Sequence, residues 1–257
     1  MGEVMDQLPA DVRESVRDEK FSSVWGNDLD KVFANVAPYY DVANYVASMG
    51  LWGWFRRRFM KTIELHPQER GLDVCAGTNA IGIALLKREP TLEMHAMDRS
   101  AEMQAVGKRN AEAAGFHIES VIGDVHTLPF PDNHFDIVTL QFASRHLRIQ
   151  QVFSEIYRVL KPGGRFYHCD MMRPTNRIVD AMSYGYLRFV LWFTALIFRS
   201  NEASLQCKEY FVSALRMFYS VPELSDVLRS LGYINVNGKS AQFGMLGFHR
   251  AVKPPVG

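Results

Sequence analysis

The sequence predicts an α/β fold built on a mostly parallel sheet, and two observations carry this prediction. Short apolar runs alternate with segments of helical periodicity between residues 71 and 169, and strands that alternate with helices form parallel sheets. The first apolar run, residues 71–75, breaks into a turn of small residues that leads straight into a helical pattern. A strand, a tight turn and a helix in this order form the corner at which open α/β sheets bind ligands. An ordinary corner with small residues is the alternative.

The composition fits one globular unit. With 257 residues, of which 47% are hydrophobic and 22% charged, the chain is long enough for one sizeable core. The net charge of +1 gives no reason to expect nucleic-acid binding, which shows as a basic patch or stripe. Cys75, Cys169 and Cys207 are scattered and predict buried thiols in a reducing compartment. The spacing of the histidines predicts no metal site.

The sequence also predicts a soluble, cytoplasmic protein. The N-terminus is acidic and polar and contains no apolar signal segment. The longest apolar run, residues 189–198, is about half of what a membrane-spanning helix needs. The sequence leaves open whether the protein contacts the membrane surface.

The N-terminal part predicts helices. Residues 1–30 are charged and weakly patterned, so we expect a loosely attached helix there. From residue 30 apolar side chains recur at helical spacing, until residues 38–41 end that helix before another begins.

Residues 50–59 combine aromatic and basic side chains. Trp52, Trp54 and Phe55 precede three consecutive arginines at 56–58. Such a segment can lie at a lipid–water boundary, with its rings at the headgroup level and its arginines near anionic lipid. The alternative is an amphipathic helix that covers a substrate pocket and leaves its arginines in solvent.

Three aspartates stand at the ends of successive predicted strands. Asp73 ends the first strand near Gly77, whose missing side chain lets the backbone approach a ligand. Asp98 ends the second strand about twenty residues beyond the turn, where an acidic residue holds the hydroxyls of a ribose. Asp124 follows the third strand and is a candidate acceptor for an adenine amino group; an ordinary turn aspartate is the alternative.

Two more strands are expected at residues 135–140 and 165–169. Asp136, at the entry to the first of them, is expected to fix the local backbone. His168 and Asp170, at the end of the second, are expected to face the ligand crevice and are second-choice site residues.

Several short motifs occur in a fixed order over about ninety residues: Asp73 with its turn, Asp98, Gly123-Asp124, residues 128–136 and residues 158–165. Together they resemble a class I S-adenosylmethionine-dependent methyltransferase. The resemblance implies a three-layer Rossmann-like fold with a seven-stranded sheet whose last strand is antiparallel. It also implies S-adenosyl-L-methionine as cofactor and S-adenosyl-L-homocysteine as product. The residues that it assigns to the cofactor are Asp73, Cys75, Ala76, Gly77, Thr78, Asn79, Asp98, Arg99, Met103, Gly123, Asp124, Val125, Gln141 and Phe142.

Segments outside these motifs narrow the resemblance. Residues 32–44, 49–51, 142–146, 208–211 and 248–253 are similar to the ubiquinone/menaquinone biosynthesis C-methyltransferase (UbiE-like) family. This similarity covers nearly the whole chain and implies methyl transfer to a ring carbon of a lipophilic phenol or quinol. A lipophilic small molecule is then the partner, while a peripheral membrane contact and a homodimer stay open.

The resemblance also sets the expected organisation of the chain. Residues 1–66 are expected to form a helical cap, and residues 67–257 the methyltransferase core. A helical insertion is expected in that core at about residues 171–217, and the last two strands at residues 233–237 and 242–249.

The chemistry of ring methylation gives three residues expected roles. A ring carbon is a poor nucleophile until the neighbouring hydroxyl loses its proton, so a base and a cation near that hydroxyl help. The resemblance implies that Arg145 stabilises the phenolate and that Tyr210 lies beside the substrate. His146, where the family usually has asparagine, would orient the phenolate or accept its proton. Each residue also has an alternative role: Arg145 could form a surface salt bridge, His146 could be a hydrogen-bonded spacer, and Tyr210 could be a core tyrosine.

The sequence departs from the family in two places. In the turn, Asn79 and Ala80 stand where the family has glycine and aspartate; Asn79 can adopt the left-handed conformation, but Ala80 cannot replace a carboxylate. In the insertion, a denser aromatic stripe than the family suggests is expected to be core, or to wall a tunnel for a long apolar substrate. The stripe consists of Tyr184, Tyr186, Phe189, Trp192, Phe193 and Phe198.

Two other functions stay open from the sequence. The first is methylation of another small molecule, including a secondary metabolite, at carbon or oxygen. The second is that the altered turn binds the cofactor without methyl transfer, in a different reaction or a regulatory role.

Overall fold

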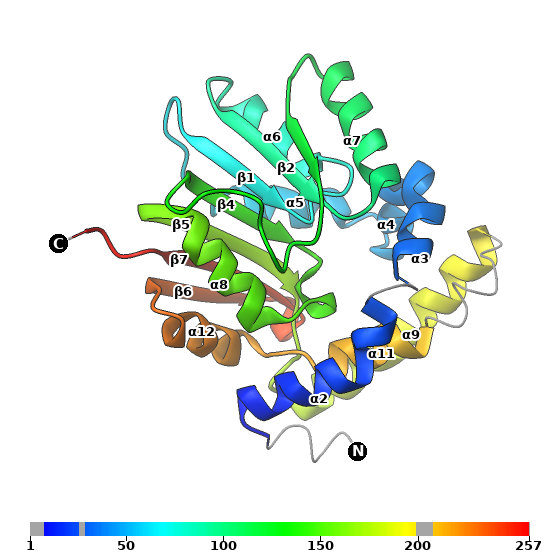
Figure 1. Cartoon of the computed structure of the whole chain (residues 1–257). Coiled ribbons are helices and arrows are strands. Elements are labelled where there is room, and N and C mark those ends of the chain that lie inside the picture. The colour runs from blue at the N-terminus through cyan, green and yellow to red at the C-terminus, as the bar shows by residue number, and fades with distance from the viewer. Residues whose placement is uncertain (1–7, 26–28, 199–207, 257) are drawn as a thin grey trace.

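The computed structural model describes residues 8–25, 29–198 and 208–256. Its centre is a seven-stranded sheet with the order β3-β2-β1-β4-β5-β7-β6 (Figure 1). Neighbouring strands among β1 to β5 pair in parallel, and β7 runs antiparallel to both β5 and β6. The expected seven-stranded sheet with an antiparallel last strand is confirmed. The strands are β1 Arg70–Val74, β2 Glu93–Asp98, β3 Glu119–Ile122, β4 Phe135–Gln141, β5 Leu160–Met171, β6 Ile234–Ala241 and β7 Leu246–Val252.

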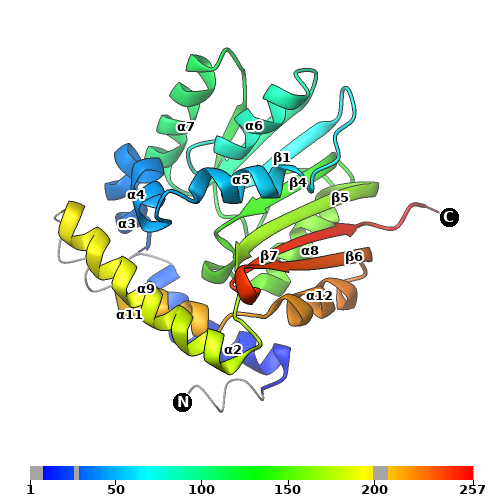
Figure 2. The ribbon, with the colours of Figure 1, turned by 180° about the vertical axis from the view of Figure 1, so that it is seen from behind.

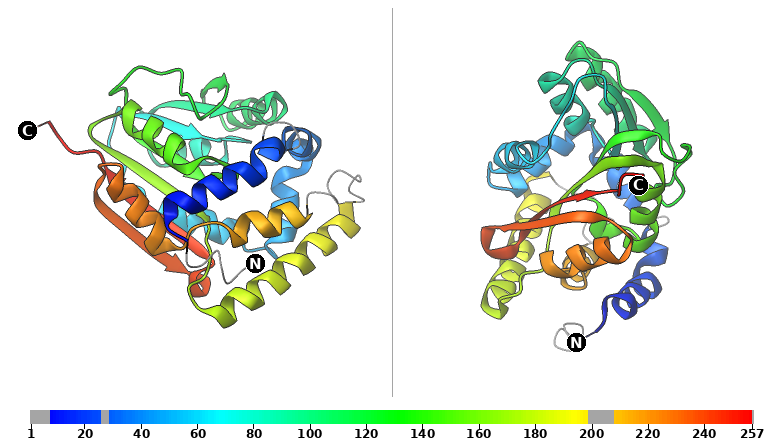
Figure 3. Two further views of the ribbon diagram at one scale, coloured as in Figure 1. Left: turned by 60° about the horizontal axis from the view of Figure 1, so that its bottom comes forward. Right: turned by 90° about the vertical axis from the view of Figure 1, so that its left-hand side faces the viewer.

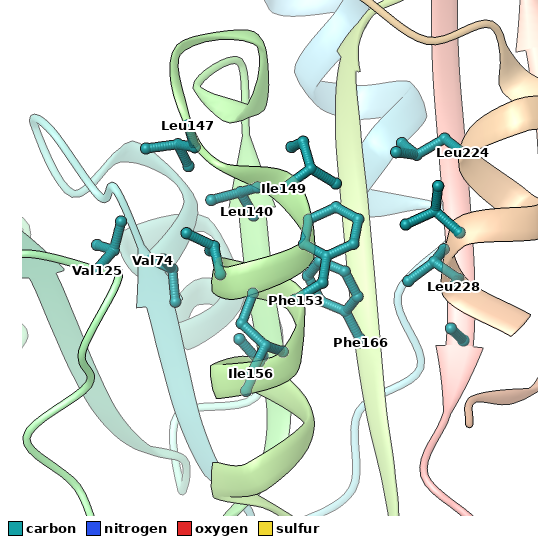
Figure 4. Close-up of a cluster of buried hydrophobic side chains, with 14 of the residues drawn as sticks. Val74, Val125, Leu140, Leu147, Ile149, Phe153, Ile156, Phe166, Leu224 and Leu228 are labelled. Atoms are coloured by element: carbon teal, nitrogen blue, oxygen red, sulfur yellow. The ribbon is translucent and has the colours of Figure 1, made fainter. Parts of the chain in front are cut away.

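On one face of the sheet lie α8 (Ile149–Val159) and α12 (Val221–Ser230). Helix α8 packs there because Ile149, Val152, Phe153 and Ile156 recur at helical spacing and are all fully buried. Figure 4 shows this cluster between the two helices and the sheet.

On the other face lie α5 (Trp52–Met60), α6 (Ala80–Arg88) and α7 (Ala101–Ala113). Phe59 of α5 packs with Leu85 of α6 in a second buried cluster. Helices on both faces give the three layers, and Figure 2 shows α5 in front of the sheet from this side.

Further helices cover the carboxyl ends of the parallel strands. Figure 3 shows α2, α9 and α11 side by side at this end. Among the residues that the structure describes, no helix is long and apolar enough to cross a membrane. The helices at this end are α2 Ala10–Ser23, α3 Leu29–Val36, α4 Tyr40–Ala47, α9 Arg177–Phe198 and α11 Lys208–Arg216, with a 3-10 turn at Ala37–Tyr39 between α3 and α4.

Helix α2 is firmly packed, so the expectation of a loosely attached helix is wrong. Arg17 is fully buried and donates hydrogen bonds to the main-chain oxygens of Arg145 and Leu147, at 3.0 and 3.4 Å. Phe21, one helical turn further on, packs edge-on against Tyr210 of α11. The charge pattern misled because an arginine buries its aliphatic arm along apolar surface while its head group finds polar partners.

The aromatic stripe of α9 is not core, so that expectation is also wrong. Phe189, Trp192 and Phe193 are 53%, 55% and 40% exposed, whereas Tyr184 and Tyr186 are half-buried. The side chain of Phe198, like Cys207, lies outside the described residues. Periodicity correctly predicted a helix, but it does not say which face turns toward the protein.

Some strand boundaries differ from those expected. Strand β5 begins at Leu160 rather than at residue 165, because the chain shifts register against β4 between Phe135 and Ile137. Residues Gln242–Gly244 form a 3-10 turn, and the last strand extends beyond it to Val252. As expected, Asp136 fixes the backbone: its carboxylate accepts from the main-chain N–H of Arg70 at 2.9 Å.

Candidate active site

In the turn after β1, three residues have the left-handed backbone conformation. Cys75, Gly77 and Asn79 have φ of 55°, 52° and 59°, so Asn79 does adopt the conformation expected of it. The main-chain N–H of Gly77 donates to the Asp98 carboxylate at 2.9 Å, which ties the tip of β2 to the turn. The side chain of Asn79 points into the protein, where its oxygen accepts from Gln104. The turn therefore presents its backbone, and not the Asn79 side chain, toward the carboxyl edge of the sheet.

Two adjoining pockets lie at this edge. The large pocket spans about 720 Å³ and the small pocket about 400 Å³, and both volumes include space that is open to solvent. Both are lined by Tyr40, Cys75, Gly77, Gln141 and Phe142. The large pocket is further lined by Trp25, Leu29, Phe33, Asp98, Arg99, Met103, Asp124, Val125, His126, Ala143, His146 and Leu147. The small pocket is further lined by Asp41, Trp52, Asp73, Ala76, Thr78, Ala80 and Ile81.

Most of the residues predicted for the site come together around these pockets. Four of the predicted residues line neither: Asn79, Gly123, Arg145 and Tyr210. Asn79 and Gly123 shape the backbone, since the main-chain N–H of Gly123 donates to the main-chain oxygen of Asp98. The predicted residues that line a pocket are Asp73, Cys75, Ala76, Gly77, Thr78, Asp98, Arg99, Met103, Asp124, Val125, Gln141, Phe142 and His146.

The carboxylates of the site are oriented by local hydrogen bonds. Asp98 accepts from the main-chain N–H groups of Gly77 and Ser100, one on each oxygen, and burial raises its pKa. A carboxylate offers about four lone-pair sites, so Asp98 can still accept from a ligand hydroxyl. Asp73 is 2% exposed and accepts from Thr139 at 2.6 Å, and burial raises its pKa to about 7. These groups fit the hydroxyl and amino functions of a nucleoside cofactor.

His146 is fixed by a chain of aromatic partners. The indole N–H of Trp25 donates to the Tyr210 hydroxyl at 2.8 Å, and that oxygen lies 2.5 Å from Nδ1 of His146. A hydroxyl that accepts from the Trp25 indole keeps its own hydrogen to donate, so the Tyr210 O–H can donate to Nδ1. The neutral imidazole then carries its hydrogen on Nε2. Burial, with the charges of Arg145 and Arg17 nearby, holds the His146 pKa well below its usual value.

The Nε2 atom of His146 is buried and has no hydrogen-bond partner among the residues that the structure describes. A buried donor without an acceptor costs roughly 1–3 kcal/mol. Because the ring lines the large pocket, an oxygen of a bound ligand is the natural acceptor. In this tautomer His146 can donate to a ligand oxygen from Nε2.

Arg145 is held by a buried polar network. Its Nη1 donates to Asp170, which is fully buried and also accepts from Ser144. Ser144 in turn contacts His168 at 2.8 Å, and His168 contacts His249 of β7. His168 and Asp170 line neither pocket, so the expectation that they face the crevice is wrong. They act below the site, as support for the loop that carries Arg145.

The cap contributes pocket residues that were not individually predicted as site residues from the sequence. They come from α2, α3, α4, α5 and their flanks. Tyr40 and Asp41 lie in the segment 32–44 that carried the family resemblance, and Trp52 lies in the segment 50–59, for which a helix covering the pocket was one of two alternatives. Trp52 stacks on Phe142 with ring centroids 4.8 Å apart, which brings the start of α5 over the end of β4. The missed residues from these helices and their flanks are Trp25, Leu29, Phe33, Tyr40, Asp41 and Trp52.

A sequence model of the ubiE/COQ5 methyltransferase family matches residues 18–253. The chain belongs to the ubiE/COQ5 methyltransferase family. A demethylmenaquinone methyltransferase of Anoxybacillus flavithermus is 34% identical over 229 residues, which are 88% of this chain and 95% of the relative. The UbiE ubiquinone/menaquinone biosynthesis C-methyltransferase of Cereibacter sphaeroides is 31% identical, over 86% of this chain and 89% of its own length.

Among solved structures, the fold matches that of phosphoethanolamine N-methyltransferase 2 of Haemonchus contortus in complex with S-adenosylhomocysteine. The TM-score is 0.58 at 17% identity, over 80% of this chain and 53% of that one. This ubiE/COQ5 family member is thus an S-adenosylmethionine-dependent methyltransferase with the class I fold.

Proposed function

We propose that the enzyme methylates a ring carbon of a lipophilic phenol or quinol, such as a precursor of ubiquinone or menaquinone. The names of the relatives support this substrate class. The observation that carries the proposal is the cap side of the large pocket. Its wall from Leu29, Phe33 and Leu147 is apolar, and His146 adds one unsatisfied buried donor. Such a wall suits an aromatic ring with a single oxygen to be recognised.

The residues of the chain have distinct tasks in this mechanism. His146 donates from Nε2 to the ring oxygen and stabilises the negative charge that develops there as the hydroxyl proton leaves to water. The imidazole stays neutral because its pKa is lowered, so it cannot act as an efficient base near neutral pH.

Arg145 adds positive charge beside this donor while Asp170 fixes its orientation. Tyr210 and Trp25 hold the imidazole in the donor tautomer. When bound, S-adenosylmethionine supplies the electrophilic methyl group. Asp98 and Asp124 are suited to hold its ribose and adenine, because both line the large pocket.

The test of this function is methyl incorporation from labelled S-adenosylmethionine. We expect transfer to prenylated quinols and little to water-soluble phenols of the same ring pattern. Transfer only to a water-soluble substrate would instead support the alternative of a methyltransferase for another small molecule. His146→Leu, which removes the donor but leaves the cofactor residues intact, is the matched inactive control.

We also propose a peripheral membrane contact through one apolar surface, which we call the α4–α5–α9 face. Figure 2 shows these three helices on one side of the molecule. The exposed residues of α9 recur at helical spacing, so they form one outward stripe. The α4–α5–α9 face consists of Val42, Tyr45, Met49, Leu51, Trp54, Ile178, Met182, Phe189, Trp192 and Phe193, all at least 40% exposed.

The chemistry of this face favours a lipid surface over a second copy of the chain. Arg57 and Arg58 of α5 are exposed beside it, and Arg58 lies over the Trp54 ring at 5.2 Å. Aromatic rings with flanking basic side chains are suited to anionic bilayers. Since the proposed substrate dissolves in lipid, contact with the bilayer would bring the pocket to it.

Sedimentation with vesicles tests the contact. We expect binding to phosphatidylcholine vesicles that contain phosphatidylglycerol, and at least about tenfold weaker binding when Phe189 and Trp192 are both changed to serine. Ile234→Ser, which removes a 40% exposed side chain on β6, is the matched control. Equal vesicle binding by all three proteins, or a dimer in solution that buries Trp192, would contradict the proposal.

A further inference from the structure

The small pocket lacks a carboxylate in the turn. Ala80 lines this pocket with a methyl group that cannot pair with a charge. Asp41 lines the same pocket from the first turn of α4. Its carboxylate accepts a hydrogen bond from the hydroxyl of Thr78 at 3.2 Å. A carboxylate from the cap therefore reaches the turn, two residues before Ala80.

The small pocket is built for a cation. The residues described in its wall include two carboxylates, Asp41 and Asp73, and no lysine, arginine or histidine. The rings of Tyr40, Trp52 and Phe142 also line it. Carboxylates and aromatic faces both attract positive charge, and more strongly where water is partly excluded.

Asp73 alone is poorly suited to hold this cation. It is 2% exposed, and Thr139 already occupies one of its oxygens. Burial raises its pKa to about 7, so a large fraction is protonated at neutral pH. Asp41 is only half-buried and leaves one carboxylate oxygen without a bond to the turn.

We propose that Asp41 binds the α-ammonium group of S-adenosylmethionine and supplies the carboxylate that the turn lacks at position 80. The inference depends on the cofactor, and not on the proposed quinol substrate. Because Asp41 belongs to the cap and Thr78 to the core, the amino group of the cofactor links the two parts. The product S-adenosylhomocysteine keeps this amino group and is held in the same way.

Calorimetry with S-adenosylhomocysteine tests the proposal on four proteins: wild type, Asp41→Asn, Ala80→Asp and the double variant. We expect Asp41→Asn to weaken binding by about ten- to a hundredfold, as for the loss of a hydrogen bond between charged groups. We expect the double variant to regain most of the lost affinity. Aspartate at position 80 begins α6, where the helix dipole favours a carboxylate, so this variant is expected to fold.

A second ligand separates a binding role from a structural one. The nucleoside 5′-methylthioadenosine has no amino group, so wild type and Asp41→Asn should bind it equally well. Asp226→Asn, which changes an exposed acid on α12, is the matched control and should bind both ligands as the wild type does. Thermal melting checks that every variant is folded.

Two results would overturn the inference. One is an unchanged affinity of Asp41→Asn for S-adenosylhomocysteine. The other is an equal loss for both ligands, which would make Asp41 a support of the turn only. If wild type binds S-adenosylhomocysteine but methylates no quinol, the proposed substrate fails while the Asp41 inference stands.

Discussion

His146 offers the sharpest prediction, because a donor and a base require different replacements. Asparagine keeps an N–H donor but has no basic nitrogen, whereas leucine keeps neither. Removing one donor to a developing oxyanion lowers the rate by roughly 10²- to 10³-fold, or about 2.7–4 kcal/mol. We therefore expect His146→Leu to lose that much in single-turnover methyl transfer, and His146→Asn to stay within roughly tenfold of wild type.

The pH dependence of the same rate provides an independent check. A base of ordinary pKa would lose activity as the pH falls through about 6.5. Burial, with Arg145 and Arg17, lowers the pKa of His146 well below that value. The ring therefore stays neutral near pH 6.5. We expect the pH profiles of wild type and His146→Asn to have the same shape around that pH.

Single-turnover rates at saturating S-adenosylmethionine, with its affinity measured separately, isolate the chemical step. Both replacements disturb the hydrogen bond from Tyr210, so urea unfolding must show that they are comparably folded. The donor role would be refuted if His146→Asn were as slow as His146→Leu. It would also be refuted by an inflection near pH 6.5 that disappears in His146→Asn.

Three further predictions concern the cofactor and the cap. Asp98→Ala should weaken cofactor binding in calorimetry, whereas Arg145→Ala should lower turnover with little change in cofactor affinity. Arg145→Lys keeps a positive charge paired with Asp170, so it separates the loss of the guanidinium from the loss of that ion pair. Equal loss of cofactor affinity in the Asp98 and Arg145 variants would contradict their roles. Asp73 lines the small pocket with Asp41 and has its pKa raised to about 7, so its ionised form should add to the attraction that Asp41 exerts on the ammonium group. Affinity should therefore fall as the pH drops below 7, and Asp73→Asn should lose this dependence. Arg17→Met should reduce the free energy of unfolding in urea by roughly 2–4 kcal/mol, because it leaves buried carbonyl oxygens without donors, while exposed Lys20→Met should not.

The sheet, and the carboxyl edge at which the cofactor residues gather, could be predicted because the sequence features that indicate them are local. Each strand shows its own apolar run, and the carboxyl ends of parallel strands meet at one edge whatever the rest of the chain does. Asp73, Asp98 and Asp124 stand at three such ends, so their convergence followed from topology alone. The bulge in β5 did not follow, since a register shift depends on the pairing strand.

The cap and the helical insertion could not be predicted in the same way, because their contacts join residues that are distant in the sequence. Trp25 and Tyr210 are 185 positions apart, and only their meeting fixes the tautomer of His146. Arg17 carries the charge of a surface residue but is fully buried. On α9, core and membrane-facing stripes have the same periodicity, so the sequence could not say which way Trp192 points.

The same cap explains how the altered turn can still serve a cofactor. Tyr40 lines both pockets, and its neighbour Asp41 bonds to the turn through Thr78, so α4 contributes to the proposed cofactor site as well as to the proposed substrate wall. A charge lost from the core at Ala80 can therefore be supplied by the cap without any change in the sheet. A chimera that keeps the core of this enzyme, with Ala80, can test this. Its cap comes from a relative that has aspartate at position 80 and no acid at position 41. We expect this chimera to bind the cofactor more weakly. Calorimetry on such a chimera, with Ala80→Asp as the rescuing change, measures how far the two halves of the site depend on each other.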